Sequence, residues 1–366
     1  MLPKRVTEAS VSFEVGQGFY RPQSKIIRDL GVLAAVVYRQ EYGQLQVLDG
    51  MAATGVRSRR YAMESRADFA WTNDADPDLE ALLTRNLGDL GERHRLTLKS
   101  FQRLCLELQT ANIRFDLVDV DSFGAPAALL PGILEITRFG GLLYVTSTDG
   151  RSLTGHLPVK SLRDWGAWSR AHPASHEQGL RLLIGGIQQT AASLGLGIEP
   201  VFSFFTGETY RVMVQLAKRP VLNEENFGFT SYCHHCGEYS AIAWKQLGKV
   251  ICSCQTRPVL SGPLWRGKLH CDRWLESMRS QATKWQWTRA ESLLALMQAE
   301  NSLPPYFYLL GDIGRRGQSD IPPKQQLIQA LHHQGFSASG THVHGEGLKT
   351  TASLKTCVAI AKSLAV

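Results

Sequence analysis

Residues 114–126 read RFDLVDVDSFGAP, and the fold can be predicted outward from this stretch. Its first half is a short run of apolar and β-branched residues, which is typical of a buried strand. The run ends in Asp119 and Asp121, and Phe123 follows two residues later. Ligands of open α/β sheets bind beyond the carboxyl ends of the strands, so these side chains are expected at a ligand site. A strand with an acidic helix cap and a core phenylalanine would explain the same residues.

The three side chains suit chemistry on the exocyclic amine of a nucleobase. A carboxylate accepts hydrogen bonds from an amino group, and an aromatic ring stacks on a flat base. Asp121 and Phe123 therefore form a candidate amine site. Asp119 is either a second acceptor or a support for the loop, and we favour support.

Strands and helices alternate on both sides of this stretch. Apolar residues recur at helical spacing over 23–42, and again after Pro77 at Leu79, Leu82, Leu83 and Leu87, which predicts two helices. Further helices are predicted from the turn at 50–57 to about residue 65, and over about 176–194. Strands are predicted from short β-rich runs at 45–49, 67–71, 95–99, 115–121 and 140–146, followed by a strand pair at 198–205 and 210–216. This alternation predicts an α/β fold with a parallel sheet covered by helices on both faces.

The turn after the first predicted strand is a candidate nucleotide-binding turn. Small residues at Ala52, Ala53 and Gly55 allow the backbone to approach a ligand at a helix N-terminus. Asp74 follows Gly55 by 19 residues, at the end of the next strand. An acid at that place can accept hydrogen bonds from ribose hydroxyls.

The spacing of this turn fits NAD and S-adenosylmethionine equally well. The full Gly-x-Gly-x-x-Gly that serves a pyrophosphate is absent, and nothing else supplies the chemistry of a nicotinamide dehydrogenase. Arg28 and Arg57 could pair with a carboxylate, which S-adenosylmethionine has and NAD lacks. The alternative is that both arginines lie on solvated helix faces and bind no ligand.

Composition limits the class of protein. The 366 residues are 43% hydrophobic and 20% charged, which suits a soluble protein of two or three domains. No apolar run is long enough to cross a bilayer and no secretion signal is evident, so we expect a cytoplasmic protein without membrane contact. Residues 1–219 hold 25 Lys and Arg against 23 Asp and Glu, whereas residues 220–366 hold 15 against 10. The basic second half favours a polyanion partner.

Five of the seven cysteines lie between residues 233 and 271. Two closely spaced pairs among them suit a tetrahedral zinc, and the expected ligands are Cys233, Cys236, Cys252 and Cys254. Substitutes for a misplaced cysteine are His234, His235, His270 and Cys271. Four thiolates leave no open position, so the zinc would be structural and not catalytic. Reduced free thiols are the alternative.

Tryptophans and basic residues alternate over residues 265–289. Such a mixture can bind RNA, because aromatic rings stack on bases and basic side chains attract the phosphates. A helix with a tryptophan core face and a solvated basic face explains the pattern as well, and it is compatible with RNA contact.

Together these residues resemble the tRNA guanosine N2-methyltransferase family, whose members make dimethylguanosine at position 26 of tRNA. The resemblance rests on ordered motifs that cover almost the whole chain. In chain order they are Phe19-Tyr20-Arg21-Pro22 with Arg28-Asp29, Leu48-Asp49, Ala53-Thr54-Gly55-Val56-Arg57 with Arg60-Tyr61-Ala62, Asn73-Asp74, Asp119-x-Asp121-x-Phe123-Gly124-x-Pro126, Thr146-x-Thr148-Asp149, Tyr210-Arg211, Gly262-Pro263-Leu264-Trp265, and Thr341-His342 with Lys349-Thr350.

The resemblance implies a class I, Rossmann-like S-adenosylmethionine methyltransferase domain at residues 1–219, with an antiparallel last strand. It implies a smaller α+β C-terminal domain at residues 220–366, which carries the zinc knuckle and binds tRNA. The implied catalytic residues are Asp121, Phe123, Asp119 and Phe19. The implied cofactor-binding residues are Arg28, Asp49, Thr54, Gly55, Arg57, Asp74 and Ala75. We expect one or two methyl groups to be transferred to guanosine N2, by a monomer.

The sequence departs from the family pattern at three places. Ser122 stands where the family has Pro, which permits a looser loop. Arg21 replaces an Asn, and residues 100–103 lack the acid that the family directs at the adenine amine. Two alternatives stay open: an amino-methyltransferase acting on another RNA or DNA base, and a tRNA-binding protein with weakened catalysis.

Overall fold

The computed structural model describes residues 5–364 and has a seven-stranded sheet at its centre. Neighbouring strands are parallel except at β9, which runs antiparallel to both of its neighbours. In order across the sheet the strands are β5 (His94–Leu98), β4 (Phe69–Asp74), β3 (Gln46–Asp49), β6 (Phe115–Val120), β7 (Thr137–Ser147), β9 (Thr209–Ala217) and β8 (Gly197–Thr206). The predicted α/β sheet and its antiparallel last strand are confirmed.

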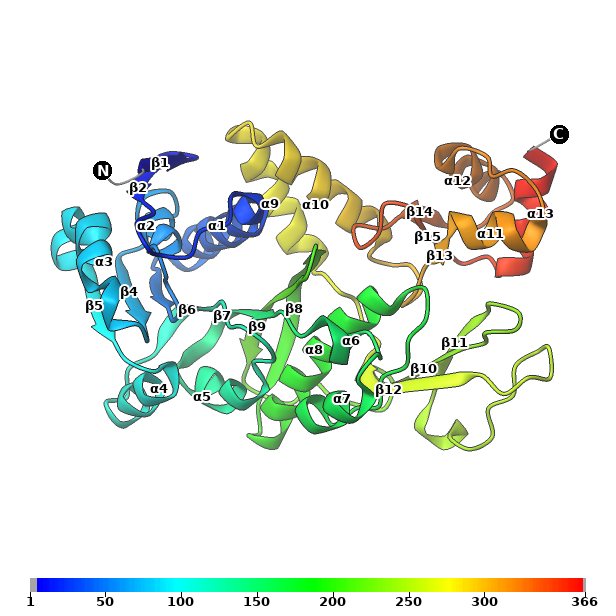
Figure 1. The fold of residues 1–366 in the computed structure, drawn as a ribbon, viewed down its shortest axis with the longest axis horizontal. Helices are drawn as coiled ribbons and strands as arrows, with labels where there is room; N and C mark the ends of the chain where they lie inside the picture. The colour runs from blue at the N-terminus through cyan, green and yellow to red at the C-terminus, as the bar shows by residue number, and fades with distance from the viewer. Residues whose placement is uncertain (1–4, 365–366) are drawn as a thin grey trace.

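Helices cover both faces of this sheet (Figure 1). On one face α4 (Phe101–Thr110), α5 (Leu130–Glu135) and α8 (Ser175–Ser193) share a single apolar cluster with the strands. The other face is covered by α1 (Lys25–Tyr42) and α2 (Val56–Met63), with α3 (Glu80–Leu87) beside α2 near the β5 edge. Short helices α6 (Gly150–Leu153) and α7 (Pro158–Trp165) lead from β7 to α8.

The sequence explains the limits of α1. Its residues from Ile26 to Tyr38 are buried without a gap, and most of them are apolar. Gly43 follows the last turn with φ of 77°, and its N–H donates to the carbonyl of Arg39. Glycine adopts this left-handed conformation without a Cβ penalty, so the helix ends there.

A hairpin of β1 (Arg5–Glu8) and β2 (Val11–Glu14) lies against α2. Short 3-10 helices connect several elements; they are η1 (Pro22–Ser24), η2 (Pro77–Leu79), η3 (Gly88–Arg93, kinked at Gly91), η4 (Ala127–Leu129) and η5 (Trp244–Gln246). No helix in the described part of the chain is both long and apolar enough to span a bilayer.

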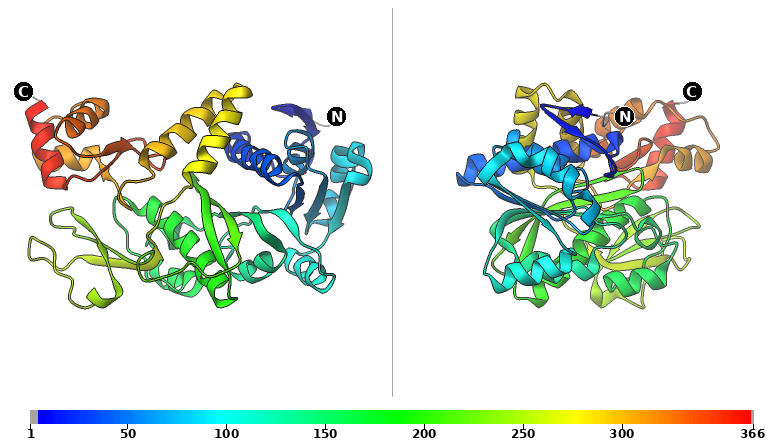
Figure 2. Two further views of the ribbon diagram at one scale, coloured as in Figure 1. Left: turned by 180° about the vertical axis from the view of Figure 1, so that it is seen from behind. Right: turned by 60° about the vertical axis from the view of Figure 1, so that its left-hand side comes forward.

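After β9 the chain builds three further groups of elements. An antiparallel sheet has the order β11 (Tyr239–Ile242), β10 (Phe227–Tyr232), β12 (Val259–Trp265). A helical hairpin consists of α9 (Asp272–Lys284) and α10 (Thr288–Glu300). At the far end, Figure 2 shows a group in orange and red that contains β13 (Tyr308–Leu309), α11 (Leu310–Gly317), α12 (Lys324–His333), β14 (Ala338–Gly340), β15 (Gly347–Thr350) and α13 (Leu354–Leu364).

The predicted division at residues 219 and 220 falls in the loop between β9 and β10, and it stays a prediction. The helical hairpin returns to the first half, because apolar side chains of α9 and α10 share one cluster with those of α1. Trp274 is 2% exposed, and the Trp287 ring lies beneath the cations of Lys25 and Arg60. These tryptophans therefore join the two halves by packing.

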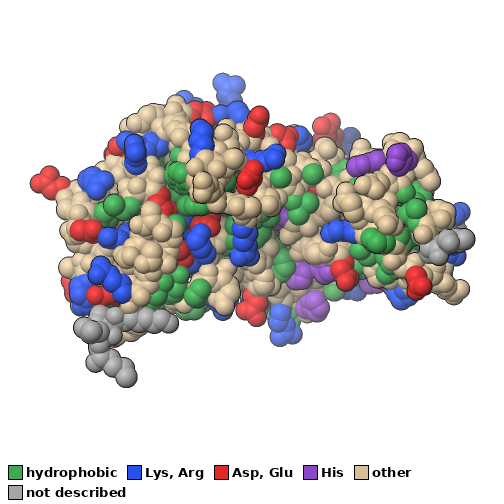
Figure 3. All heavy atoms as spheres, turned by 90° about the horizontal axis from the view of Figure 1, so that it is seen from above, with side chains coloured by type: hydrophobic (Ala, Val, Ile, Leu, Met, Phe, Trp, Pro, Cys, Tyr) green, Lys and Arg blue, Asp and Glu red, His purple; other side chains and the backbone are tan. Residues whose placement is uncertain are grey.

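The charge of the surface is mixed. On the face shown in Figure 3, Lys and Arg side chains spread over the left and centre with acidic side chains between them, while His side chains gather toward the right. The Lys and Arg side chains on this face do not merge into one continuous patch.

Candidate active site

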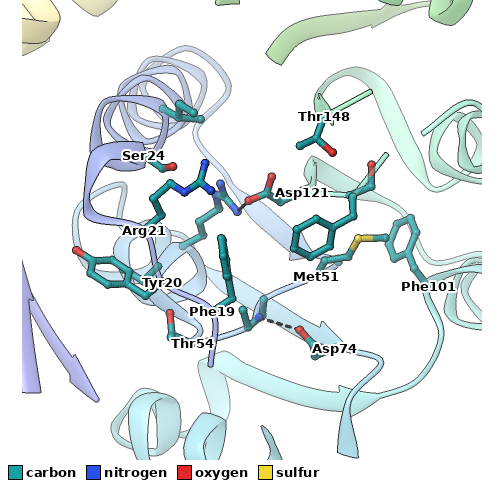
Figure 4. A pocket seen from close by; sticks show the side chains of 18 of the residues that line it. Phe19, Tyr20, Arg21, Ser24, Met51, Thr54, Asp74, Phe101, Asp121 and Thr148 are labelled. Carbon is teal, nitrogen blue, oxygen red and sulfur yellow. Dashed lines mark hydrogen bonds and ion pairs between the residues drawn. The ribbon is translucent and has the colours of Figure 1, made fainter. Parts of the chain in front are cut away.

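A cavity of about 550 Å³ opens beside the carboxyl ends of β3, β4 and β6. In Figure 4, Asp121 lies between Thr148 on one side and Asp74 on the other. Most of the residues predicted for the site line this cavity; they are Phe19, Arg28, Thr54, Arg57, Asp74, Ala75, Asp121 and Phe123. Side chains that are far apart in the sequence thus meet at one edge of the sheet.

Three predicted residues lie behind the lining instead of in it. Asp119 is fully buried, so it cannot touch a substrate, and the supporting role is the one that its position allows. Asp49 is 2% exposed and accepts hydrogen bonds from the N–H and hydroxyl of Ser58, at 3.1 and 2.8 Å. It shapes the start of α2 from beneath. Gly55 also stands outside the lining, and its backbone makes the turn.

The turn between β3 and α2 is held in a tight conformation. Gly55 has φ of 74°, in the left-handed region that glycine favours. A Cβ on Gly50 would lie 2.4 Å from the Phe101 ring, so no larger residue fits there. The N–H of Ala53 donates to Asp74 at 2.8 Å, and this bond ties the turn to the acid after β4.

The loop after β6 is fastened to the end of β7. The hydroxyl of Ser122 donates to the carbonyl of Thr146 at 3.0 Å. Gly124 donates its N–H to the Thr148 hydroxyl at 2.7 Å, and its carbonyl accepts the N–H of Thr148 at 3.0 Å. Ser122 therefore ties the loop to β7 through its side chain, and the looser loop expected from the sequence stays a prediction.

Two aromatic rings project from the lining. Phe123 is 80% exposed and Phe19 is 58% exposed, which is unusual for side chains of this size. Their ring centroids are 5.9 Å apart at an interplanar angle of 74°. Rings exposed on two separate loops, beside the Asp121 carboxylate, offer apolar faces to a flat ligand.

Beneath Asp121 lies a group of charged side chains that we call the open charge cluster. It consists of Asp49, Arg57, Asp119, Asp121 and Arg211. The guanidinium of Arg57 pairs with Asp121 Oδ2, and Arg211 Nη2 lies 2.9 Å from Asp119 Oδ1 and 3.4 Å from Asp121 Oδ1. Among these side chains only Asp121 is substantially exposed, at 32%.

The carboxylates of this cluster differ in pKa. Burial disfavours the charged form of Asp121, but the charges of Arg57 and Arg211 outweigh it and hold the pKa of Asp121 below its usual value. Burial and the nearby charge of Asp119 raise the pKa of Asp49 to about 7. At neutral pH the cluster therefore presents an ionised carboxylate to the cavity.

The two arginines expected to meet a ligand carboxylate already have protein partners. Arg28 donates from Nε to Glu8 Oε1 at 2.7 Å and pairs through Nη2 with Oε2 of the same residue. Arg57 pairs with Asp121. Both line the cavity, so a ligand carboxylate would share these guanidiniums with the protein carboxylates and would not meet them unpaired.

The lining also contains residues that the sequence did not single out as ligands. They include Tyr20, Met51, Phe101, Gln102 and Glu208. Ser100, Phe101 and Gln102 belong to residues 100–103, where the resemblance implies an acid that this chain lacks, so that departure faces the cavity. Glu208 comes from the turn between β8 and β9, and no sequence pattern connects that turn with the other strands. Thr148, a residue of the motif Thr146-x-Thr148-Asp149, lines the cavity as well.

The four predicted zinc ligands come together at one end of the β10–β12 sheet. The Sγ atoms of Cys233 and Cys254 are 3.5 Å apart, and those of Cys236 and Cys252 are 3.3 Å apart. All four lie within 4.8 Å of one another. None is in a disulfide.

His342 and Lys349, two motif residues without an assigned role, belong to a second group that we call the closed charge cluster. Its members are Glu177, Arg181, His270, Glu300, His342 and Lys349. Lys349 Nζ lies 2.9 Å from Glu177 Oε1 and 3.5 Å from Glu300 Oε2, and His342 Nδ1 contacts Glu300 Oε1. Every one of these side chains is at most 4% exposed. The cluster joins α8 of the sheet region to α10 and β15.

The ligand atoms of His270, Glu300 and His342 lie within 4.8 Å of one another, a spacing that a metal ion could use. Two features oppose this. His270 Nδ1 accepts the N–H of Ser203 at 3.2 Å, so its Nε2 carries the proton. Lys349 already supplies positive charge to Glu300. The arrangement is a buried ion network.

Comparison with known proteins identifies the family. Residues 4–362 match the model of the N2,N2-dimethylguanosine tRNA methyltransferase family. A tRNA (guanine(26)-N(2))-dimethyltransferase of Pyrococcus horikoshii is 30% identical over 352 residues, covering 91% of this chain and 89% of that protein. The corresponding protein of Thermoplasma acidophilum is 32% identical over 343 residues, covering 92% and 88%.

A solved structure agrees with this. Trm1 from P. horikoshii, in complex with S-adenosyl-L-methionine, superposes with a TM-score of 0.84 at 27% identity, covering 98% of this chain and 99% of that one. The chain belongs to the N2,N2-dimethylguanosine tRNA methyltransferase family.

Proposed function

We propose that this chain transfers one or two methyl groups from S-adenosylmethionine to N2 of guanosine 26 in tRNA. The observation that carries the proposal is the pair of exposed rings, Phe19 and Phe123, beside the ionised carboxylate of Asp121 in one cavity. Family membership supplies the substrate, because the relatives are described as acting on guanine 26. The proposed compartment is the cytoplasm.

S-adenosylmethionine supplies an electrophilic methyl group on a sulfonium. The cavity fits it, since a tight turn at the start of α2 approaches the ligand and Asp74 stands at the next strand end for the ribose hydroxyls. The remaining proposed contacts come from Arg28, Thr54, Arg57 and Ala75. Asp49 and Gly55 contribute by shaping the turn.

The target guanine must leave its stack to reach this cavity. Phe123 and Phe19 would stack on the flipped base. Asp121 would accept a hydrogen bond from N2–H, which directs the nitrogen lone pair toward the methyl carbon and stabilises the positive charge that develops on nitrogen. Alignment of nitrogen, carbon and sulfur supplies most of the rate.

Incubation with unmodified tRNA transcript and methyl-labelled S-adenosylmethionine tests this proposal. The RNA is digested and its nucleosides are identified by mass. Labelled N2-methylguanosine or N2,N2-dimethylguanosine is expected. Label in another base would favour a different amino-methyltransferase, and tRNA binding without label would favour a binding protein with lost catalysis.

We also propose that Cys233, Cys236, Cys252 and Cys254 hold one structural zinc ion. A tetrahedral ion with Zn–S bonds of about 2.3 Å separates its sulfurs by roughly 3.8 Å, close to the separations found here. Metal analysis after gel filtration should give one zinc per chain. Cys236→Ser should lose the metal, whereas Cys105→Ser, which changes a buried cysteine elsewhere, should keep it. A folded, metal-free wild type would refute the site.

The remaining proposals concern the roles of the two domains and the oligomeric state. We assign methyl transfer to residues 1–219 and tRNA binding to residues 220–366, in a monomer. Light scattering at assay concentration should give the mass of one chain, 40.6 kDa. A stable dimer would contradict this.

A further inference from the structure

Both carboxylate oxygens of Asp121 are engaged from behind the cavity. Arg57 of α2 pairs with Oδ2, and Arg211 of β9 approaches Oδ1 at 3.4 Å. The Arg211 side chain is fully buried and that of Arg57 is 10% exposed, whereas that of Asp121 is 32% exposed. The carboxylate therefore faces the cavity while its charge partners lie beneath it.

Arg211 is itself held from three directions. Its Nη2 donates to Asp119 at 2.9 Å, its Nε donates to the Thr146 hydroxyl, and its guanidinium lies 4.0 Å from the centre of the Tyr144 ring. A planar guanidinium fixed in this way cannot rotate, and a lysine could not reproduce its geometry.

Asp119 connects the two arginines. Its Oδ1 accepts from Arg211, while its Oδ2 accepts the Tyr61 hydroxyl at 2.7 Å and lies 3.6 Å from Arg57 Nε. Because Asp119 is fully buried, its charge serves the arginines and not a substrate. The four charged side chains form one rigid support with a single exposed carboxylate.

We propose that Arg211 and Arg57 are positioning residues that hold Asp121 as a fixed, ionised hydrogen-bond acceptor, which orients guanine N2 without taking its proton. This inference rests on the proposed function. In the transfer step the N2–CH₃ bond forms as the CH₃–S bond breaks, and the bonding electron pair stays on sulfur. The methylated nitrogen then carries a positive charge and releases its proton to water.

The charges around Asp121 explain why it keeps no proton. The titratable and charged groups that face it or its partners are Asp49, Arg57, Tyr61, Asp119, Tyr144 and Arg211. Burial opposes ionisation, yet the two guanidiniums hold the pKa of Asp121 below its ordinary value. A carboxylate of that acidity is a weak base but still a good acceptor of hydrogen bonds.

The test compares variants of Arg211. Arg211→Lys keeps the charge and loses the planar fork; kcat should fall about 100-fold while KM for tRNA changes little, because alignment is lost. Arg211→Met leaves Asp119 without its main partner and is at risk of misfolding. The double variant Asp119→Asn with Arg211→Met removes one charge of each sign and avoids that risk. In this double variant kcat should remain below the wild-type value, and the acid limb of the pH–rate profile should move to higher pH.

A matched control breaks an ion pair at the other end of β6. Arg138 pairs with the buried Asp116 at 2.8 Å, away from the cavity. Asp116→Asn with Arg138→Gln should lose stability but keep both kcat per folded molecule and the wild-type pH profile. Wild-type kcat and profile in the Arg211 double variant would overturn the proposal.

A second readout needs no activity. Carboxyl ¹³C resonances of labelled aspartates are followed by NMR against pH, and the Asp121 signal is assigned with Asp121→Asn. In the wild type this signal should not titrate above about pH 4, the ordinary range of an aspartate, and in the double variant its midpoint should rise. An Asp121 that titrates above pH 4 in the wild type would overturn the inference. The expected titration in a protein that makes no methylguanosine would instead refute the proposed function alone.

Discussion

The open and closed charge clusters have similar composition but differ in their contact with solvent. Each places carboxylates between basic side chains within the buried interior. The open cluster presents Asp121, 32% exposed, to a cavity. In the closed cluster Glu177 and Glu300 are 0% and 1% exposed, and no member lines the cavity described above. Buried charge alone therefore does not indicate a catalytic site, whereas a carboxylate exposed to a cavity does.

The largest expected effect is on activity, in the open cluster. Asp121→Ala removes the acceptor for N2–H and should reduce methyl transfer by about 100- to 1000-fold, the range for loss of one stabilising group. Affinities for S-adenosylmethionine and tRNA, measured by calorimetry and filter binding, should change little. Wild-type turnover in this variant would remove Asp121 from the mechanism.

In the closed cluster the expected effect is on stability. Lys349→Met leaves Glu177 and Glu300 with one cation fewer in a buried site, and the free energy of unfolding should fall by roughly 3–5 kcal/mol. Denaturant unfolding measures this. The control is Lys160→Met, which breaks partly exposed ion pairs with Asp149 and Asp164 and should cost only about 1 kcal/mol. Equal losses of unfolding free energy in both variants would contradict a stabilising role for the buried Lys349.

A smaller, more selective effect is expected at the exposed ring. Phe123→Leu removes a stacking surface worth about 1–3 kcal/mol, so kcat/KM for tRNA should fall about tenfold or more. Cofactor affinity and melting temperature should not change, because the ring is 80% exposed. Phe139→Leu, at an exposed ring outside the cavity, should leave all three values as in wild type. An unchanged rate for Phe123→Leu would argue against stacking.

The smallest effect is a pH dependence confined to the open cluster. The folded pKa of Asp49 is raised to about 7, above that of the unfolded chain. Its stabilising contribution is therefore complete below about pH 4 and is lost as pH rises through 7. Asp49→Asn should flatten the fall in melting temperature between pH 5 and 8. The same slope in wild type and variant would show that Asp49 does not titrate there.

The sequence predicted the sheet because periodicity reports local structure. The strand Phe115–Val120 and the turn at Gly55 follow from short-range patterns, whereas the antiparallel direction of β9 was implied by the family resemblance. The cavity residues on the strand ends were predictable for the same reason, since parallel strands end at one edge.

The charge partners were not predictable. Nothing in the sequence indicates that Arg57 meets Asp121, or that Arg28 meets Glu8 twenty residues earlier. Such pairs depend on the spatial order of strands and helices, which is not the sequence order. Lys349 shows this most clearly, because its partner Glu177 is 172 residues away.

The most direct measurement compares two tRNA transcripts that differ at one atom group. Guanosine 26 is replaced by inosine, which has the same ring and lacks only the N2 amine. With methyl-labelled S-adenosylmethionine, the guanosine transcript should be labelled at position 26, and the inosine transcript should bind with similar affinity and receive no label there. Equal labelling of the two transcripts would show that N2 of guanosine 26 is not the acceptor.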